Sequence, residues 1–382
     1  MKKIFIFISI MVLLFISACF PENSAPVLET STQEPILKPT KIVSTSTNLP
    51  ITADANSIQP FQDVRGRRLT SLEQAFDESL ILTLKFNTYT KWPESVDATA
   101  QRIFQAGMNP GLGVRALHEE GINGEGVTVA IIDQTLFLDH PEFTHKIIEY
   151  QEFAKSTASA ASYHGPAVTS LLVGENTGTA PGARIYYVAA GAQDAQSYGD
   201  ALNWIIDKNS QLPDGEKIRA VSVSTVTSGP GTPFTKNLDL WRTAVERAND
   251  AGILVIDCAT DQGIVAPCTL DIDHPDDPSR CTPGLPIIDN YYPDPSRIHV
   301  PVSRRTFAAE SYKGINYYQY IGLGGISWSA PYLTGVLALG WQINPQLTNE
   351  QILDILFETA IKQDGAKIIN PPAFIEAIKK TQ

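Results

Sequence analysis

Three residues whose side chains can carry out acyl-transfer chemistry stand at the ends of strongly patterned segments. Asp133 follows the apolar run 127–132, while His164 and Ser327 each open an apolar stretch of helical pattern. A hydroxyl alone is a poor nucleophile near neutral pH, but an imidazole can take its proton and a carboxylate can orient that imidazole. Singly, an aspartate at a turn, a histidine at a helix start and a serine at a cap have ordinary structural explanations. Together, at the ends of a strand and two helices, they are the three residue types that a nucleophilic triad uses.

The segments that must position these residues predict a sheet flanked by helices. Nearly continuous apolar runs, typical of strands buried on both faces, occur at residues 127–132, 185–189, 220–226 and 253–256. Helical patterns occur at residues 165–172, 198–209, 238–249, 327–341 and 349–360. Strands that alternate with helices indicate an α/β fold with a doubly wound, mostly parallel sheet and helices on both faces. Ligands bind at the carboxyl ends of strands in such sheets, which is where Asp133 stands.

The motifs around the three residues resemble those of the subtilisin-like serine peptidases, the subtilases. The resemblance covers residues 109–382, and Asp, His and Ser follow one another in the order found in subtilisin. Its motifs are the aspartate segment 126–133, the His-Pro-Glu-Phe element 140–143, the His164-Gly165 pair with Val168, the Ala-Pro-Gly-Ala turn 180–183, and Gly325-x-Ser327 with Pro331. Ser327, with Gly two residues before it and Pro four after it, fits the family motif, whereas Ser329 does not.

The resemblance implies a serine endopeptidase that acts on peptide or protein substrates through an acyl-enzyme. Ser327 would attack the peptide carbonyl, His164 would move the proton, and Asp133 would hold the imidazole. The family implies a peptide-binding strand at residues 221–224, so we expect Ser222 and Ser224 at a free edge that pairs with an extended substrate. No nucleic-acid partner is expected, because 29 Lys and Arg against 41 Asp and Glu give a net charge of −12.

One position departs from the family in a way that bears on catalysis. Asp261 stands where the family places an Asn whose amide donates to the oxyanion. An ionised carboxylate has no donor, and loss of one such donor costs on the order of 10²–10³ in rate. We expect Asp261 to be protonated in a desolvated site and activity to favour acidic pH. The alternatives are that Gln262 supplies the amide, or that catalysis is weak.

Two features of the loop region after residue 257 bear on stability and metal binding. Cys268 and Cys281 flank a loop rich in Asp and Pro and can pair in an exported protein, whereas Cys258 follows a buried strand and reads as a core thiol. The loop carboxylates, Asp271, Asp273, Asp276 and Asp277, are of the kind that Ca²⁺ uses, and many subtilases bind calcium. Their spacing matches no calcium loop and favours a plain surface loop. We therefore expect no metal and no other cofactor, with calcium as the alternative.

The N-terminus predicts export and lipid anchoring. Two lysines precede the apolar run 4–16, which is too short for a confident membrane span and fits a signal-peptide core. Small residues before Cys19 resemble the lipobox of bacterial lipoproteins, so the lipid on Cys19 would hold the protein on a membrane, outside the cytoplasm. An ordinary secretory signal is the alternative.

The domain organisation follows from these features. We expect a signal peptide at residues 1–18, a disordered Ser/Thr/Pro-rich tether at 19–60, an N-terminal extension or prosegment remnant at 61–108, and the peptidase domain at 109–382. A catalytically silent subtilase-fold binding protein on the cell surface is the alternative function, favoured by Asp261.

Overall fold

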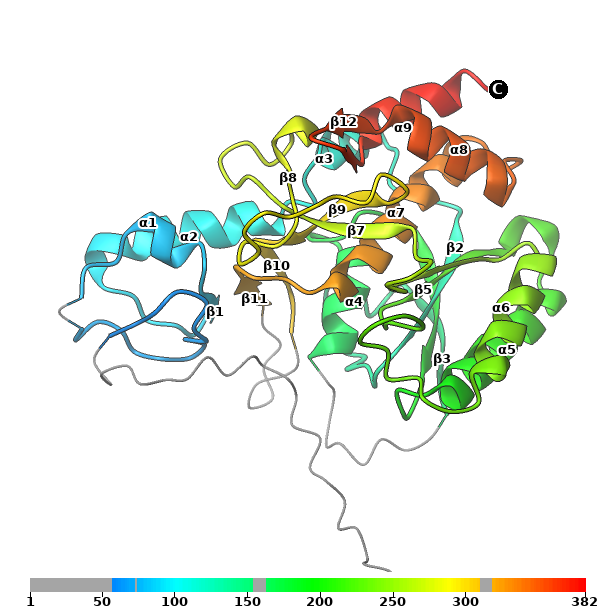
Figure 1. Ribbon diagram of the computed structural model, residues 1–382, viewed down its shortest axis with the longest axis horizontal. Helices are drawn as coiled ribbons and strands as arrows, with labels where there is room; N and C mark the ends of the chain where they lie inside the picture. The colour runs from blue at the N-terminus through cyan, green and yellow to red at the C-terminus, as the bar shows by residue number, and fades with distance from the viewer. Residues whose placement is uncertain (1–56, 73, 154–162, 310–317) are drawn as a thin grey trace, which may run out of the picture. The chain divides into compact units, whose positions relative to one another are not determined.

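The computed structural model describes residues 57–72, 74–153, 163–309 and 318–382 (Figure 1). The predicted signal peptide, Cys19 and nearly all of the predicted tether lie outside these residues. Residues 53–382 form one compact unit. Among the described helices, none has the length and apolar character needed to cross a bilayer.

A five-stranded sheet with strand order β3-β4-β2-β5-β6 forms the centre of this unit. All four neighbouring pairs are parallel. The strands are β2 (Thr128–Asp133), β3 (Ile147–Glu152), β4 (Arg184–Ala189), β5 (Ile218–Val223) and β6 (Leu254–Asp257). Every residue of β2 is buried, as expected for a strand covered on both faces. The mostly parallel α/β fold predicted from the sequence is therefore confirmed.

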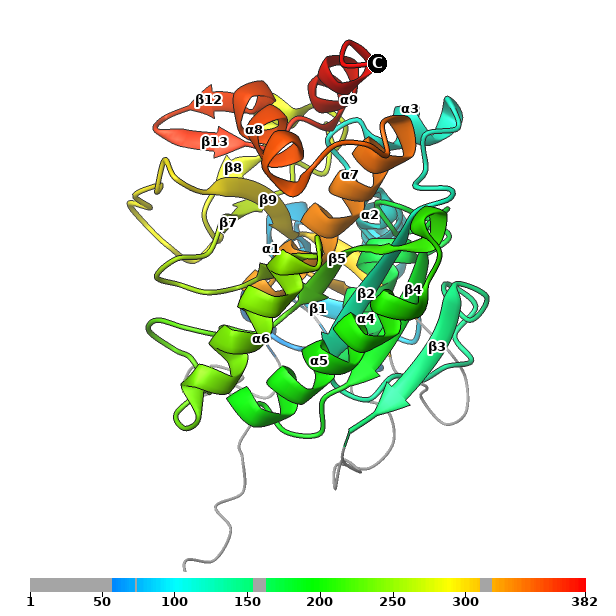
Figure 2. The same ribbon diagram turned by 90° about the vertical axis from the view of Figure 1, so that its right-hand side faces the viewer.

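Alternate residues of β2 divide the core into two halves. Val129 and Ile131 pack in the cluster that includes buried residues of α4 (His164–Val173) and α7 (Ser329–Ile343). Ala130 and Ile132 pack in the cluster of α5 (Ala195–Gln211) and α6 (Leu238–Asp250). Successive side chains of a strand point to opposite faces, so the two helix pairs cover the two faces of the sheet (Figures 1 and 2).

A second five-stranded sheet, with strand order β12-β13-β9-β7-β8, continues the core beside α7. Its strands are β7 (Val265–Thr269), β8 (Thr282–Pro283), β9 (Ile298–Ser303), β12 (Ile361–Gln363) and β13 (Ala366–Ile368). Cys268 and Cys281 form the expected disulfide, which closes the loop between β7 and β8. Cys258 is a buried free thiol. The remaining helices of this half are α3 (Val114–Glu119), α8 (Asn349–Thr359), α9 (Pro371–Lys379) and the 3₁₀ turn η2 (Pro278–Arg280).

The segment before residue 109 is built into the fold. Its strand β1 (Lys85–Asn87) pairs antiparallel with β11 (Tyr318–Ile321), which also pairs with β10 (Arg305–Ala308). Its helices are α1 (Glu78–Ile81) and α2 (Glu94–Met108), and α2 contacts β10 (Figure 1). Residues 78–108 thus lie in the same compact unit as the central sheet.

Candidate active site

Asp133 and His164 meet at the carboxyl end of the central sheet. Asp133 is the last residue of β2, and His164 is the first residue of α4. The Asp133 Oδ1 atom lies 2.7 Å from the His164 Nδ1 atom and also accepts a hydrogen bond from the Gln134 backbone N–H. Because the carboxylate holds the Nδ1 side of the ring, it favours the tautomer whose Nε2 atom accepts a proton.

The electrostatic surroundings of His164 favour its protonated form. Burial lowers the pKa of His164, but the charge and the hydrogen bond of Asp133 together outweigh burial and raise the pKa above its ordinary value. Asp133 itself is only 1% exposed. A buried carboxylate in contact with the ring therefore stabilises the imidazolium that forms when His164 takes a proton.

Ser327 lies on the turn that faces this pair. The turn is the 3₁₀ segment η3 (Ile326–Trp328), which contacts α4 and leads into α7. The ring centroid of Trp328 lies 5.2 Å from that of His164. A glycine fixes this turn against β9, because a Cβ atom at Gly324 would lie 1.7 Å from the Val302 carbonyl oxygen. The structure thus places Ser327 beside a residue that packs on the His164 ring.

The structure separates the two neighbouring serines by exposure. Ser327 is partly exposed, whereas Ser329 is fully buried. The Ser329 hydroxyl donates a hydrogen bond to the Ile326 carbonyl oxygen. Since a substrate can reach only the exposed hydroxyl, the geometry favours Ser327 over Ser329 as the nucleophile.

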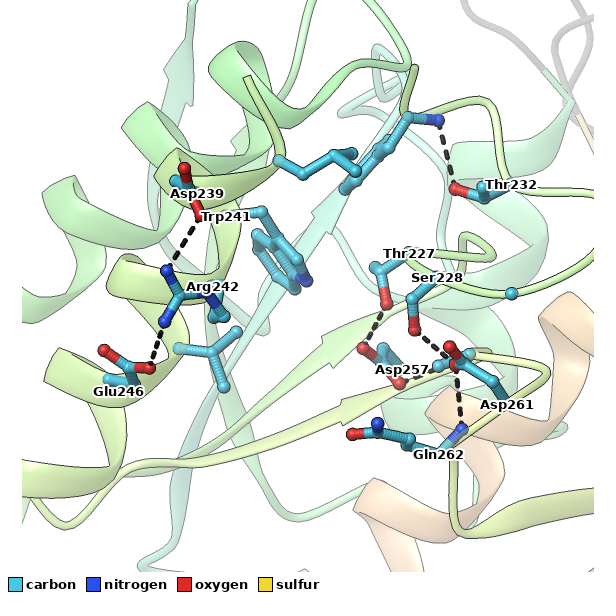
Figure 3. A pocket seen from close by; sticks show the side chains of 15 residues that line it. Thr227, Ser228, Thr232, Asp239, Trp241, Arg242, Glu246, Asp257, Asp261 and Gln262 are labelled. Atoms are coloured by element: carbon cyan, nitrogen blue, oxygen red, sulfur yellow. Dashed lines mark hydrogen bonds and ion pairs between the residues drawn. The ribbon is translucent and has the colours of Figure 1, made fainter. Parts of the chain in front are cut away.

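Asp261 does not have the surroundings that the sequence predicted. It lies on an exposed loop, where its carboxylate accepts hydrogen bonds from the Ser228 hydroxyl and the Gln262 backbone N–H (Figure 3). The hydrogen bond from Ser228 is the main cause that lowers the pKa of Asp261 below its ordinary value. The expectation of a protonated donor in a desolvated site was therefore wrong, because solvent and hydrogen bonds both favour the ionised form.

The expected peptide-binding edge at Ser222 is not free. Ser222 lies within β5, which pairs with β2 on one side and β6 on the other. Its hydroxyl is fully buried, and it has no hydrogen-bond partner among the described residues. Ser224 is also buried but lies one residue past the end of β5. The prediction of a free edge at Ser222 was wrong, since residues 218–223 are an interior strand.

The His-Pro-Glu-Phe element connects the loop after α4 to a neighbouring strand. The Glu142 side chain is fully buried. It accepts hydrogen bonds from the side chains of Asn176, Thr177 and Tyr318. These bonds join the loop after α4 to β11.

The acidic loop makes internal contacts. Asp271 accepts hydrogen bonds from the backbone N–H groups of Asp273 and His274, and Asp277 accepts from Ser279. Within the described parts of the chain, no group of three or more His, Cys, Asp or Glu side chains is arranged to hold a metal ion.

Sequence reasoning missed Asp257, the last residue of β6. Its carboxylate accepts hydrogen bonds from the Thr227 hydroxyl and the Ala259 backbone N–H, and it lines a cavity together with Asp261 (Figure 3). The sequence contained a signal for this position, because Asp257 ends an apolar strand as Asp133 does.

Fold and site together define a subtilisin-like α/β protein. Residues 124–286 match the model of the subtilase family, which agrees with the resemblance of the motifs around Asp133 and His164.

The chain is similar to curated proteases over part of their length. It is 24% identical to the subtilisin-like protease PopC of Myxococcus xanthus, over 65% of this chain and 58% of PopC. It is 28% identical to a thermostable alkaline protease of Halalkalibacterium halodurans, over 64% of each chain. The chain thus spans less than two thirds of the length of either relative.

Solved structures share the fold at low sequence identity. A chain in a structure of the subtilase cytotoxin SubAB assembly matches with a TM-score of 0.54 and 16% identity, over 71% of this chain and 96% of that chain. The prenylagaramide maturation protease PagA matches with a TM-score of 0.51 and 17% identity, over 70% of this chain and 98% of that chain.

Proposed function

We propose that this protein is a serine endopeptidase in which Ser327, His164 and Asp133 act as a triad. The observation that carries the proposal is the 2.7 Å contact between the buried Asp133 carboxylate and His164, beside the partly exposed Ser327 turn. The match to the subtilase family supports the same activity.

The proposed reaction has two steps, acylation of Ser327 and hydrolysis of the acyl-enzyme. The Ser327 oxygen bonds to the peptide carbonyl carbon while His164 Nε2 takes the hydroxyl proton. His164 then gives that proton to the leaving amine as the C–N bond breaks, which leaves an acyl-enzyme. Water, activated by His164, hydrolyses the ester and restores the serine. Asp133 stays ionised throughout and stabilises the imidazolium.

The oxyanion requires donors near the η3 turn that leads into α7. Backbone N–H groups of this turn, including that of Ser327, would favour a developing negative charge there. Asp261 adds an opposing charge, and Gln262, next to it in the sequence, has an exposed amide that can donate. We therefore expect a rate below that of an enzyme with an amide at residue 261.

Labelling with a fluorophosphonate probe tests this activity. The full chain should be labelled, and Ser327→Ala should not, whereas Ser329→Ala should be labelled as the wild type. A folded wild-type chain that is not labelled at any pH would overturn the proposal. That result would favour the second candidate, a catalytically silent subtilase-fold binding protein, which the ionised Asp261 supports.

We also propose that the protein is anchored outside the cytoplasm through a lipid on Cys19. The apolar run before Cys19 supports export, and the Cys268–Cys281 disulfide fits an oxidising compartment. Incorporation of a labelled fatty acid that is lost in Cys19→Ala, but kept in Cys258→Ala, is the expected result. Secreted protein without lipid would contradict the anchor.

A further inference from the structure

A cavity of about 550 Å³ lies between α6 and the loops that follow β5 and β6 (Figure 3). Its lining combines apolar and acidic side chains. Phe234, Trp241 and Val245 supply apolar surface, while Asp257 and Asp261 place their carboxylates on the facing wall.

The segment that carries the acidic wall passes close to the candidate nucleophile. Asp257 and Asp261 lie on either side of Cys258 in the sequence, and the Cys258 Sγ atom lies 3.4 Å from the Ile326 carbonyl oxygen. Ile326 directly precedes Ser327. The chain segment that carries both carboxylates thus contacts the serine turn through Cys258, so we expect a long side chain beside the reacting carbonyl of a substrate at Ser327 to extend into this cavity.

The cavity lining has an excess of negative charge. Four carboxylates line it, on Asp239, Glu246, Asp257 and Asp261, against one guanidinium, on Arg242. Arg242 is engaged on the opposite wall, where its nitrogens lie 2.8 Å from Asp239 and 3.1 Å from Glu246. Arg297, outside the lining, donates to the carbonyl oxygens of Ala259 and Thr260 and pairs with Asp294.

Asp257 is the more enclosed of the two carboxylates on the acidic wall. It is half-buried, and burial is the main cause that raises its pKa, with the charge of Asp261 acting in the same direction. A cation close to Asp257 would stabilise the ionised form of its carboxylate and reduce the repulsion between Asp257 and Asp261.

We propose that this cavity binds the side chain of a lysine or arginine, carried by the substrate residue whose carbonyl group Ser327 attacks. This inference rests on the proposed peptidase activity. The aliphatic stem would pack against Trp241, and the cationic head would lie between Asp257 and Asp261. The bound cation would also offset the charge of Asp261, and so reduce its repulsion of the oxyanion.

A panel of peptides that differ only at the residue before the cleaved bond tests the proposal on the full chain. The compared residues are Lys, Arg, Leu, Phe and Glu. We expect kcat/KM to be at least about tenfold higher for Lys or Arg than for Leu or Phe, and lowest for Glu, because charge complementarity favours the cation. Asp257→Asn should reduce this ratio toward one, and Asp257→Glu should keep it above one. Asp250→Asn, which removes an exposed charge on α6 outside the cavity, is the matched control and should leave the ratio unchanged.

A second measurement separates the two proposals. Benzamidine, a cationic probe, should protect Ser327 from fluorophosphonate labelling in the wild type and in Asp250→Asn, but much less in Asp257→Asn. A labelled wild type that prefers Leu or Phe and gains no protection would overturn the inference and leave the peptidase activity standing. A folded chain without labelling would overturn both.

Discussion

Asp133 and Asp261 both follow parallel strands of the central sheet, and their surroundings give them opposite effects on the reaction. Asp133 is buried against the His164 ring, so in the proposed mechanism its charge would stabilise the imidazolium. Asp261 is exposed, and hydrogen bonds lower its pKa, at the position where the family resemblance implies an oxyanion donor. In the proposed mechanism the same residue type is therefore favourable at one position and unfavourable at the other.

Replacement of Asp261 by Asn should speed the reaction. The substitution removes a negative charge and adds an amide donor, and one such donor is worth on the order of 10²–10³ in rate. We expect kcat to rise by about tenfold or more, and to rise more for substrates with Leu at the cleaved residue than for those with Lys, whose cation already offsets Asp261. Steady-state rates on the two peptides measure this. Equal or slower rates in Asp261→Asn would mean that residue 261 does not face the oxyanion.

The pH dependence of labelling should follow His164. His164 must be neutral to accept the serine proton, so activity is lost as pH falls through its pKa, which lies above the ordinary value of 6.5. Asp133→Asn removes the charge that raises this pKa and leaves burial, which lowers it. We therefore expect the acidic limb of the profile to move to lower pH and kcat to fall by about 10⁴. The acidic limb of Asp250→Asn should coincide with that of the wild type. If the acidic limb did not move in Asp133→Asn, it would report the titration of a group other than His164.

At the residue scale, the sequence predicted which residues form the candidate site better than it predicted their burial and hydrogen bonds. The motif spacing distinguished Ser327 from Ser329, and the burial of Ser329 agrees with that choice. It did not predict the ionised state of Asp261, because exposure depends on how the loop after β6 is placed by other segments. The free edge expected at Ser222 failed for a similar reason, since β6 is contributed by residues 254–257, far along the chain.

At the scale of elements, apolar pattern was informative where a strand is buried on both faces. The run 127–132 predicted β2 to within one residue at each end. Strand β3 was missed, because it is an edge strand whose residues are all partly or fully exposed and which shows no apolar run. The helix predicted from residue 327 begins instead at Ser329, after the η3 turn that holds the candidate nucleophile outside the regular helix.

The disulfide should stabilise the second sheet without affecting catalysis. It closes a loop with a sequence separation of 13 residues, and cross-linking a loop of about this size stabilises a domain by about 3 kcal/mol. We expect the double variant Cys268→Ala/Cys281→Ala to lose about 3 kcal/mol of unfolding free energy in a urea titration and to keep the labelling rate per folded molecule. Reductant should lower the unfolding midpoint of the wild type but not that of the double variant. If reductant lowered the unfolding midpoint equally in both proteins, the lower stability of the double variant would not be due to the missing disulfide.

At the scale of the whole molecule, the segment before residue 109 packs into the same core as the central sheet. Strand β1 completes the sheet with β11, and Phe86, Trp92, Ile103 and Phe104 are buried in the same core cluster as residues of α4 and α7. Arg65 donates a hydrogen bond to the Gln319 side chain, and the Lys85 ammonium lies 4.8 Å from the centroid of the Tyr163 ring, next to His164. The segment thus supports the two elements that carry the candidate histidine and serine.

Removal of this segment should therefore abolish the folded state. Loss of a single buried Phe or Trp side chain costs about 3–5 kcal/mol, and the whole stability of a domain is about 5–15 kcal/mol, so a chain that begins at residue 109 cannot keep its core. A chain that begins at residue 57 retains every described element, and we expect it to unfold cooperatively near the midpoint of the full chain. Circular dichroism melts of the two truncations measure the difference.

If the segment were instead a prosegment, the fluorophosphonate-labelled protein isolated from cells would begin near residue 109 and melt as one unit. We expect its mass to place the first residue before Ser57, because an enzyme that lost β1 and α2 would lose the support for its own active site.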